Sequence, residues 1–194
     1  MFSYITEKIV SNMEKQNMIQ TDRINIYKYG INQMFNMLLN IATFLVIGLI
    51  FHMTLETIIF TAAYIPLRIY AGGFHAKTPF KCWIVSAVML IAVLSAIKYA
   101  DLKLYVFDIL ALIGIAVILV LSPVEDKNKP LDELEKKIYK KRCILTFAAE
   151  LLIFVLLRIF QIDTASICFE AVWITLSLML IAGKIKNSII DYNR

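Results

Sequence analysis

Residues 104–122 read Leu-Tyr-Val-Phe-Asp-Ile-Leu-Ala-Leu-Ile-Gly-Ile-Ala-Val-Ile-Leu-Val-Leu-Ser and contain a single charged side chain, Asp108. A helix rises about 1.5 Å per residue and the hydrocarbon core of a bilayer is about 30 Å thick, so a spanning helix needs roughly 20 mostly apolar residues. This stretch approaches that length. It predicts a helix that lies in a membrane.

The composition of the whole chain agrees with a membrane protein. Of its 194 residues 60% are hydrophobic, and the mean hydropathy is +0.73, above what a soluble domain of this size carries. Stretches of this kind recur along the chain, at residues 31–53, 54–70, 83–100, 104–122, 143–161 and 164–183. We therefore predict an all-α fold: a polytopic integral membrane helical bundle of about six membrane helices, forming a single domain over residues 1–194.

The first two stretches are polar for helices that face lipid. Residues 54–70 contain Glu56 and Arg68, and residues 31–53 begin with four amide side chains, Asn32, Gln33, Asn36 and Asn40. Because polar groups inside a bilayer need protein partners, both stretches should pack against protein. A four-span arrangement, in which these two stretches form a re-entrant or interfacial element, is the alternative to six spans.

Basic residues indicate the orientation of the chain, because short cytoplasmic loops accumulate Lys and Arg. If both termini lie inside and the chain crosses six times, seventeen of the twenty Lys and Arg residues fall on the inner side, which leaves Lys98, Lys103 and Arg158 outside. We predict a multi-pass protein of the cytoplasmic membrane with cytoplasmic termini. The segments 68–82 and 123–142 then also face the cytoplasm.

Residues 1–30 mix acidic and basic side chains and contain no short apolar run followed by a cleavage site, so no removable signal peptide is expected. Phe2, Ile5, Ile9 and Met13 recur with helical spacing. This pattern predicts an amphipathic helix that lies either in the membrane interface or in the cytoplasm.

Residues 68–82 read Arg-Ile-Tyr-Ala-Gly-Gly-Phe-His-Ala-Lys-Thr-Pro-Phe-Lys-Cys and bring one of two histidines near one of three cysteines. On a straight helix His75 and Cys82 would share a face but stand about 10 Å apart along the axis, whereas proton transfer requires a contact of about 3 Å. Gly72-Gly73 permits positive φ, and Pro79 disfavours helical backbone at the residue before it. We therefore predict a bend on each side of His75.

His75 and Cys82 are a candidate base and nucleophile. A cysteine thiol is mostly protonated at neutral pH, and a neighbouring imidazolium stabilises its thiolate; Lys77 and Lys81 would add to this effect. The spacing alone also fits an interfacial histidine beside a buried, inert cysteine. In the reducing cytoplasm a free thiol is expected in either case.

The segment resembles the motif of the accessory gene regulator protein B (AgrB) family of quorum-sensing peptide processors. The resemblance rests on Arg68, Gly72-Gly73, His75-Ala76 and Cys82, which have the order and spacing of the family motif. A second, weaker match is Pro123 followed by Asn128-Lys129-Pro130. Chain length and the alternation of apolar and basic blocks also fit, so the resemblance covers nearly the whole chain.

The resemblance implies a membrane cysteine endopeptidase, a thiol protease that cleaves the C-terminal part of a small, amphipathic, AgrD-like autoinducer propeptide. Cys82 would be the nucleophile and His75 the general base and acid, while Arg68, Gly72 and Gly73 would shape the loop. The acyl group would pass from Cys82 to a cysteine of the peptide and close a thiolactone ring, so the site must restrict water. The resemblance also implies a homodimer, and no cofactor is expected.

Few other side chains suggest chemistry. The backbone N–H groups around Gly72 and Gly73 are candidate oxyanion donors. Cys143 and Cys168 fall in or beside apolar stretches and should be structural. No third or fourth His or Cys accompanies the 75–82 pair, so no metal site is expected. The third member of a catalytic triad stays open among the acids of the predicted spans, Glu56, Asp108, Glu150 and Glu170.

A basic cluster precedes the fifth apolar stretch and consists of Lys136, Lys137, Lys140, Lys141 and Arg142. It fits a topogenic surface that contacts lipid, and attraction of the acidic propeptide tail that the resemblance implies is compatible with that role. A net charge of +5 on the inner loops of a membrane protein does not favour nucleic-acid binding.

Two other classes of protein fit parts of the sequence. In a small membrane transporter or channel, Arg68 and the intramembrane acids would line a pathway and the cysteine would be incidental, but the chain has no internal repeat. A non-enzymatic scaffold would leave the spacing of the motif unexplained. Of the three classes, only a peptidase predicts a covalent adduct on Cys82.

Overall fold

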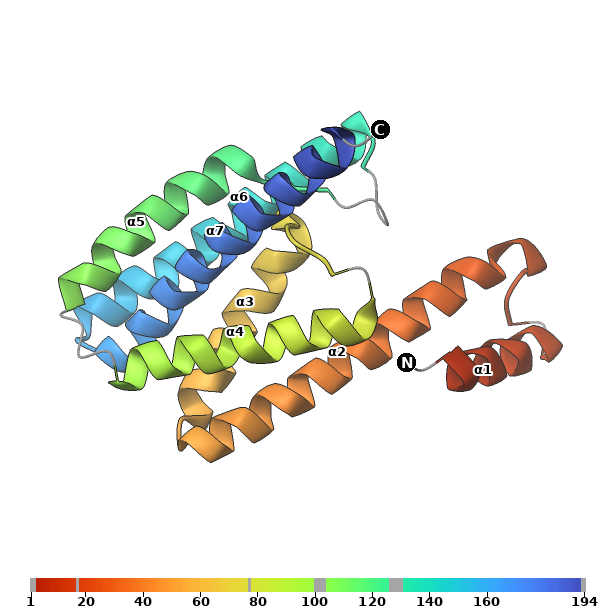
Figure 1. Cartoon of the computed structure of the whole chain (residues 1–194), viewed down its shortest axis with the longest axis horizontal. Helices are drawn as coiled ribbons and strands as arrows, with labels where there is room; N and C mark the ends of the chain where they lie inside the picture. The colour runs from red at the N-terminus through yellow and green to blue at the C-terminus, as the bar shows by residue number, and fades with distance from the viewer. Residues whose placement is uncertain (1–2, 17, 77, 100–103, 126–130, 193–194) are drawn as a thin grey trace.

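The computed structural model describes residues 3–16, 18–76, 78–99, 104–125 and 131–192. Over these residues the chain is helical, and the isolated bridge between Gly72 and Val124 is its one β-type pairing. The elements, labelled in Figure 1, are α1 (Ser3–Lys15), η1 (Thr21–Arg23), α2 (Ile24–Phe51), α3 (Thr54–Ala71), α4 (Pro79–Tyr99), α5 (Leu104–Leu121), α6 (Glu133–Ile159) and α7 (Asp163–Tyr192). The prediction of an all-α fold is confirmed.

Each of the six predicted apolar stretches corresponds to one helix, from α2 to α7. Four helices extend several residues beyond their apolar stretch: α2 begins at Ile24, α4 at Pro79 and α6 at Glu133, and α7 continues to Tyr192. The turn between α2 and α3 is tight: His52 adopts a left-handed conformation (φ 54°), and the Met53 N–H donates to the Gly48 carbonyl (2.8 Å). The two helices therefore form a hairpin.

Residues 123–142, predicted as a basic loop, are helical from Glu133. Asp132 and Glu135 form a capping box, in which Asp132 Oδ1 accepts from the Glu135 N–H (2.6 Å) and the Glu135 carboxylate accepts from the Asp132 N–H (3.2 Å). Such a box satisfies N–H groups that the first turn of a helix leaves without partners. The basic cluster therefore lies on the first turns of α6.

Three described helices are long and apolar enough to cross a membrane: α2, α4, and α7 over Asp163–Ile189. A shorter apolar helix, Tyr105–Leu121, belongs to α5. α3 and α6 fall short because α3 contains Glu56 and Arg68, and α6 has a strongly charged first half. The predicted membrane bundle thus has three to four apolar spans. The four-span alternative correctly set aside α3, but it also set aside α2, which is apolar enough to span, in place of α6.

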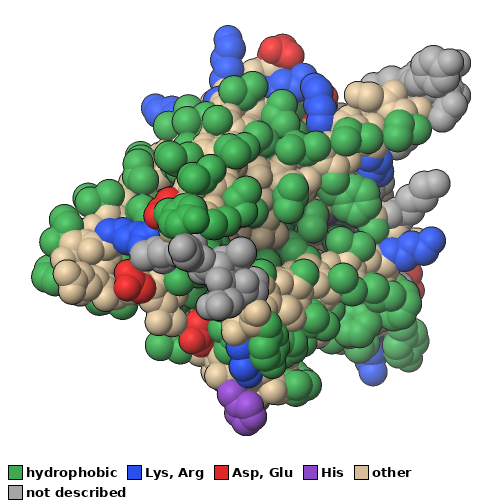
Figure 2. Space-filling view, turned by 60° about the vertical axis from the view of Figure 1, so that its left-hand side comes forward, with side chains coloured by type: hydrophobic (Ala, Val, Ile, Leu, Met, Phe, Trp, Pro, Cys, Tyr) green, Lys and Arg blue, Asp and Glu red, His purple; other side chains and the backbone are tan. Residues whose placement is uncertain are grey.

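The core of the bundle forms around α7, against which α5, α3 and α6 pack. Of the residues in the most apolar stretch of α7, 67% are buried inside the bundle, compared with 11% in the corresponding stretches of α2 and α4. Trp173 of α7 is buried and its ring meets Phe147 and Phe154 edge-on (5.4 and 5.1 Å between centroids). Hydrophobic side chains cover much of the face shown in Figure 2, which is what a lipid-facing surface requires.

The acids within the predicted spans mostly have partners, as expected. Arg158 Nη2 contacts Asp108 (2.5 Å) and Glu170 (2.6 Å), and Glu150 accepts a hydrogen bond from the Trp173 indole (3.0 Å). Arg158 links α6 to α5 and α7. A charge is tolerated in a bilayer when it is paired in this way.

α1 confirms the helix predicted in the first residues, but its buried face differs from the predicted apolar face. Thr6 and Val10 are buried, whereas Ile5 is 47% exposed; Phe2 lies outside the described residues. α1 packs against α2, and this contact, more than the spacing of apolar residues, decides which side chains are covered.

The segments predicted to face the cytoplasm lie at one end of the bundle. The loop after α3 is hydrogen-bonded to the segment after α5, since the Gly73 N–H donates to the Val124 carbonyl (3.1 Å). The last turns of α7 reach the same segment, where Asn187 Nδ2 donates to the Glu125 carbonyl (2.8 Å). Lys98, which is predicted to lie outside, is at the other end of the bundle, where its Nζ donates to the Phe51 carbonyl (2.6 Å). The side of the membrane on which each end lies stays a prediction.

Candidate active site

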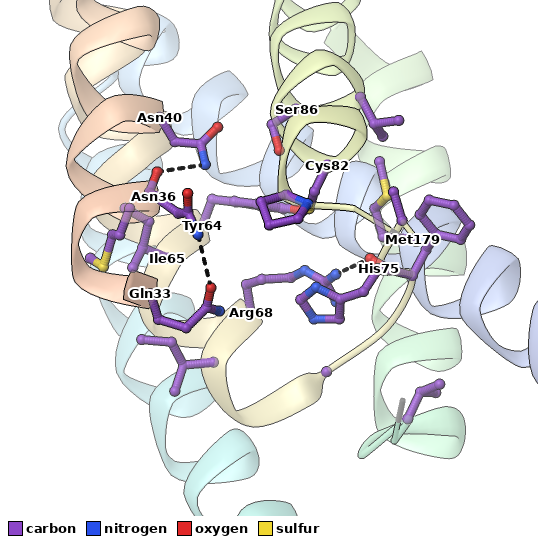
Figure 3. A pocket seen from close by; sticks show the side chains of 18 of the residues that line it. Gln33, Asn36, Asn40, Tyr64, Ile65, Arg68, His75, Cys82, Ser86 and Met179 are labelled. Carbon is purple, nitrogen blue, oxygen red and sulfur yellow. Dashed lines mark hydrogen bonds between the residues drawn. The ribbon is translucent and has the colours of Figure 1, made fainter. Parts of the chain in front are cut away.

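A cavity of about 780 Å³ opens between α2, α3 and α4 at the end of the bundle that carries the motif (Figure 3). The segments that follow α3 and α5 close it, together with Tyr139 of α6 and Met179 of α7. Trp83 Nε1 donates to Thr43 Oγ1 (2.8 Å) and so links α4 to α2 beside it. The motif residues in its wall are Arg68, Gly72, His75, Ala76 and Cys82.

The first predicted bend lies directly after α3. Gly72 and Gly73 have φ values of 71° and 116°, which side chains disfavour. The Val124 N–H donates to the Ala71 carbonyl (2.9 Å), and a Cβ on Gly72 would collide with the Val124 carbonyl. The glycine pair is therefore required both by its φ angles and by the close approach of the segment after α5.

The second predicted bend lies before α4, which begins at Pro79 as the proline suggested. Thr78 caps this helix: its Oγ1 accepts from the Lys81 N–H (3.3 Å) and its carbonyl accepts from the Cys82 N–H (3.0 Å). Cys82 consequently stands in the first turn of α4, half-buried and facing the cavity. The N-terminal turn of a helix favours negative charge.

The backbone N–H groups predicted as oxyanion donors are already in use. The Gly72 N–H donates to the Arg68 carbonyl (3.0 Å), the Gly73 N–H donates to the Val124 carbonyl (3.1 Å), and the Phe74 N–H donates to the Met179 carbonyl (2.8 Å). These bonds hold the loop in place. In this conformation these candidate oxyanion donors are therefore not free for that role.

Arg68 holds the loop from inside the cavity. Its Nη2 donates to the Phe74 carbonyl, which agrees with the predicted role in loop shape. Its Nη1 is buried and has no hydrogen-bond partner among the described residues, although a guanidinium nitrogen of this kind can donate two hydrogen bonds. A Cβ on Gly73 would collide with Nη1. Arg68, which lines the cavity, thus has an unused donor beside the loop.

His75 lies on the loop between the two bends. Its carbonyl accepts from Lys186 Nζ of α7 (2.7 Å), and the same ammonium lies over the Phe74 ring (5.6 Å to the centroid). The side chain of His75 is exposed, and Figure 3 shows it with Cys82 in the cavity, across from the amide side chains of α2. The fold brings the predicted base and nucleophile to one cavity. Lys77 lies outside the described residues.

The structure adds two residues that the sequence analysis missed, Tyr64 and Ser86, which both line the cavity. Tyr64 is buried, and its ring stacks on that of Phe60 (5.4 Å between centroids). Tyr64 stands four residues before Arg68, and Ser86 stands four residues after Cys82. Residues four apart share a helix face, so helical periodicity around the motif could have revealed both.

None of the acids proposed for a catalytic triad lies in the cavity wall. Glu125 is the acid among the described lining residues. Its carboxylate accepts from the Leu131 N–H (3.0 Å) and lies 3.7 Å from Lys136 Nζ. A hydrogen bond to Glu133 and the charge of Glu125 raise the pKa of Lys136 above its usual value. Glu125 is therefore engaged with α6, and a third catalytic residue stays unassigned.

Three members of the basic cluster have partners within the chain. Lys136 pairs with Glu125, and Lys140 Nζ donates to the carbonyls of Ser122 (2.8 Å) and Leu119 at the end of α5. The Arg142 guanidinium lies over the Tyr70 ring (5.7 Å). Lys137 and Lys141 line a shallow cavity of about 590 Å³. Of the second motif match, Pro123 lines the cavity of the motif, whereas Asn128-Lys129-Pro130 lies outside the described residues.

The remaining cysteines are in structural positions, as predicted. Cys143 and Cys168 are buried; the Cys143 thiol donates to Ser122 Oγ (3.5 Å) and the Cys168 thiol to the Thr164 carbonyl (3.2 Å). All three cysteines are free. Over the described ranges no three His, Cys, Asp or Glu side chains are grouped in a way that could hold a metal ion.

Comparison with known proteins supports the resemblance. The sequence model of the family described as Accessory gene regulator B matches residues 4–187. An AgrB-like protein of Clostridium perfringens is 28% identical over 202 residues, which cover 95% of this chain and 92% of the relative. The accessory gene regulator protein B of Staphylococcus carnosus is 26% identical, with 74% of each chain covered. Protein FsrB of Enterococcus faecalis is 28% identical over 71% of this chain and 57% of its own length. No solved structure matches the chain.

Proposed function

Because the chain belongs to the accessory gene regulator B family, we propose that it is a membrane cysteine endopeptidase of the accessory gene regulator quorum-sensing system. Its substrate is a small amphipathic propeptide of the AgrD type, cleaved near its C-terminus. The observation that carries this proposal is that His75 and Cys82, on separate segments, line one cavity.

In the first step Cys82 is the nucleophile and His75 is the general base. His75 takes the thiol proton, and Sγ attacks the carbonyl carbon of the scissile peptide bond. The C–N bond then breaks, and the imidazolium returns the proton to the leaving amine. The peptide remains joined to Cys82 as a thioester.

Arg68 stabilises the negative charge that develops on the substrate carbonyl oxygen in this step. Arg68 lines the cavity, and its buried Nη1 has no partner among the described residues. The backbone N–H groups of the loop are engaged in the fold, so they cannot take this role without rearrangement. A donor that is held in position before the reaction is what charge stabilisation requires.

In the second step a cysteine of the bound peptide attacks the thioester carbonyl carbon. The Cys82 thiolate leaves, and the peptide closes into a thiolactone. One thioester replaces another, so the step loses little free energy, whereas hydrolysis would be strongly favourable; the site must therefore restrict water. Apolar side chains in the cavity wall support this requirement, and they include Met37, Ile41, Phe44, Val85 and Met89.

The proposal extends to the surroundings of the site. The cavity faces the cytoplasm, because the basic segments share its end of the bundle, and the protein acts as a homodimer, as the family resemblance implies. Lys137 and Lys141, which line the shallow cavity on α6, contact lipid head groups or the acidic tail of the propeptide. These features follow from the charge distribution and from the resemblance.

Co-expression with the propeptide tests the proposal. A propeptide whose own cysteine is changed to Ala can acylate the enzyme but cannot close the ring, so a thioester adduct should accumulate on Cys82 and be released by hydroxylamine. His75→Ala should give no adduct, because the thiolate does not form and the leaving amine is not protonated. Mass spectrometry of the purified, monodisperse enzyme measures both. An adduct of equal yield in His75→Ala removes His75 from this step, and no adduct on the unmodified enzyme favours a transporter.

A further inference from the structure

The wall of the cavity opposite Cys82 carries a regular row of amides. Asn32, Asn36 and Asn40 are spaced by four residues on α2, so they lie on one face of this helix, and all three line the cavity. α2 as a whole, Ile24–Phe51, is apolar enough to span a membrane. Figure 3 shows Asn36 and Asn40 projecting from α2, with Ser86 and Cys82 across the cavity.

The row has unused hydrogen-bonding capacity. Asn40 Nδ2 donates to the Asn36 carbonyl (3.0 Å), and Asn36 Nδ2 donates to Gln33 Oε1 (3.3 Å). In contrast, Oδ1 of Asn32 and Oδ1 of Asn40 are buried without a hydrogen-bond partner in the described part of the chain. Buried acceptors of this kind are unfavourable. A ligand that supplies N–H groups at both ends of the row would satisfy them when the two amides rotate toward the cavity.

The spacing of the row matches an extended peptide. Residues four apart on a helix are about 6 Å apart along its axis. An extended chain repeats every two residues, after about 6.6–6.8 Å, and its backbone N–H and C=O groups point to the same side with that repeat. Three amides therefore meet alternate residues of one extended strand over about five residues. A lipid chain offers no N–H groups and would leave both oxygens unsatisfied.

We propose that Asn32, Asn36 and Asn40 form an amide ladder that binds the main chain of the substrate propeptide in an extended conformation. This inference rests on the proposed function and names the part of the substrate that α2 recognises. The ladder bonds main-chain groups, so it accepts different side chains and positions the scissile bond before Cys82. The apolar residues of the cavity cover the side chains of the strand.

A binding experiment separates the ladder from the chemistry. The probe is a synthetic peptide that covers the cleavage region of the propeptide and carries a fluorophore, and the protein is Cys82→Ala in lipid nanodiscs. Asn40→Leu, which has nearly the same size as the native side chain, should weaken binding about 3- to 10-fold, the range for one lost hydrogen bond. Leu38→Met, on an exposed side of α2, is the matched control and should leave binding unchanged.

N-methylation of single peptide amides then distinguishes a hydrogen bond from a general effect on folding. One N-methylated position should weaken binding to the parent protein by a similar factor and have no further effect with Asn40→Leu. If N-methylation at every position weakens binding to Asn40→Leu as much as to the parent protein, the ladder is wrong. The ladder is also wrong if the peptide binds Asn40→Leu as tightly as the parent, or if it does not bind the parent. The expected pattern with a peptide that the active enzyme does not cleave supports the ladder and overturns the peptidase proposal.

Discussion

The backbone of Gly183 in α7 packs directly on the backbone of Gly73 in the loop. A Cβ on Gly183 would lie 2.7 Å from the Gly73 carbonyl carbon and 2.7 Å from the Phe74 nitrogen, closer than van der Waals contact permits. The Phe74 N–H also donates to the Met179 carbonyl one turn earlier on α7 (2.8 Å). The position of the loop that bears His75 is therefore set by the buried central helix.

Replacing Gly183 should consequently disturb the site from a distance. Gly183→Ala forces the loop away from α7, and a shift of about 1 Å in a catalytic group can reduce activity by about 10²-fold. Gly30→Ala is the control, because a Cβ at Gly30 meets nothing within 4 Å. Precursor cleavage by the two variants in the same membranes measures the difference. Equal activity would show that the loop adapts without loss.

Cys82→Ala and Cys82→Ser should each abolish cleavage while the protein still inserts in the membrane, since a hydroxyl lacks the acidity of a thiol. Cys143→Ala and Cys168→Ala should retain most activity, because both thiols are buried away from the cavity. Immunoblots of precursor and product test all four variants. Near-normal cleavage by Cys82→Ala would falsify the nucleophile assignment.

Arg68→Lys should reduce the rate of acylation by about 10²-fold. A lysine keeps the charge, but its side chain has only one terminal nitrogen. It therefore cannot donate to the Phe74 carbonyl from one nitrogen and leave a second nitrogen for the substrate. The rate of adduct formation with the cysteine-free precursor gives the measurement. If Arg68→Lys acylates at the parent rate, the fork geometry of Arg68 is not needed.

Lys140 and Lys137 should differ although both belong to the basic cluster. Lys140→Ala removes the cation that caps the carbonyl end of α5 and should reduce the free energy of unfolding by about 1–2 kcal/mol. Lys137 makes no such contact among the described residues, so Lys137→Ala should leave the free energy of unfolding unchanged. Thermal unfolding in detergent compares them. If the cluster acted only by contacting lipid, the two variants would unfold at the same temperature.

The orientation can be tested with single cysteines in a chain that has no others. A cysteine at position 129, which lies outside the described residues, should resist a membrane-impermeant reagent added to intact cells, because the basic segments are predicted to lie inside. Ile162→Cys, in the exposed turn between α6 and α7, should react. Efficient labelling at position 129 would reverse the orientation of the bundle and of its cavity.

Much of the fold could be predicted from local pattern. Apolar length predicted the helices α2 to α7, and the dipeptide Gly72-Gly73 with Pro79 predicted both bends around His75. The basic residues on α6 did not prevent a helix, because the capping box of Asp132 and Glu135 starts it earlier than the apolar stretch. A helix cap is recognised by its polar side chains. Because the prediction used hydrophobicity alone, it placed the start of α6 too late in the sequence.

The sequence by itself supplied the candidates for the chemistry: the spacing in one short segment indicated His75 and Cys82 as a candidate base and nucleophile, and the family resemblance added Arg68 as a residue that shapes the loop. Only the tertiary structure decided what surrounds them. The loop N–H groups bond Val124 and Met179, which are remote in sequence, and the amides of α2 face the cavity because α3 and α4 pack beside that helix. The physical reason is that a motif specifies local backbone and functional groups, whereas burial and hydrogen-bond partners depend on contacts between segments far apart in the chain.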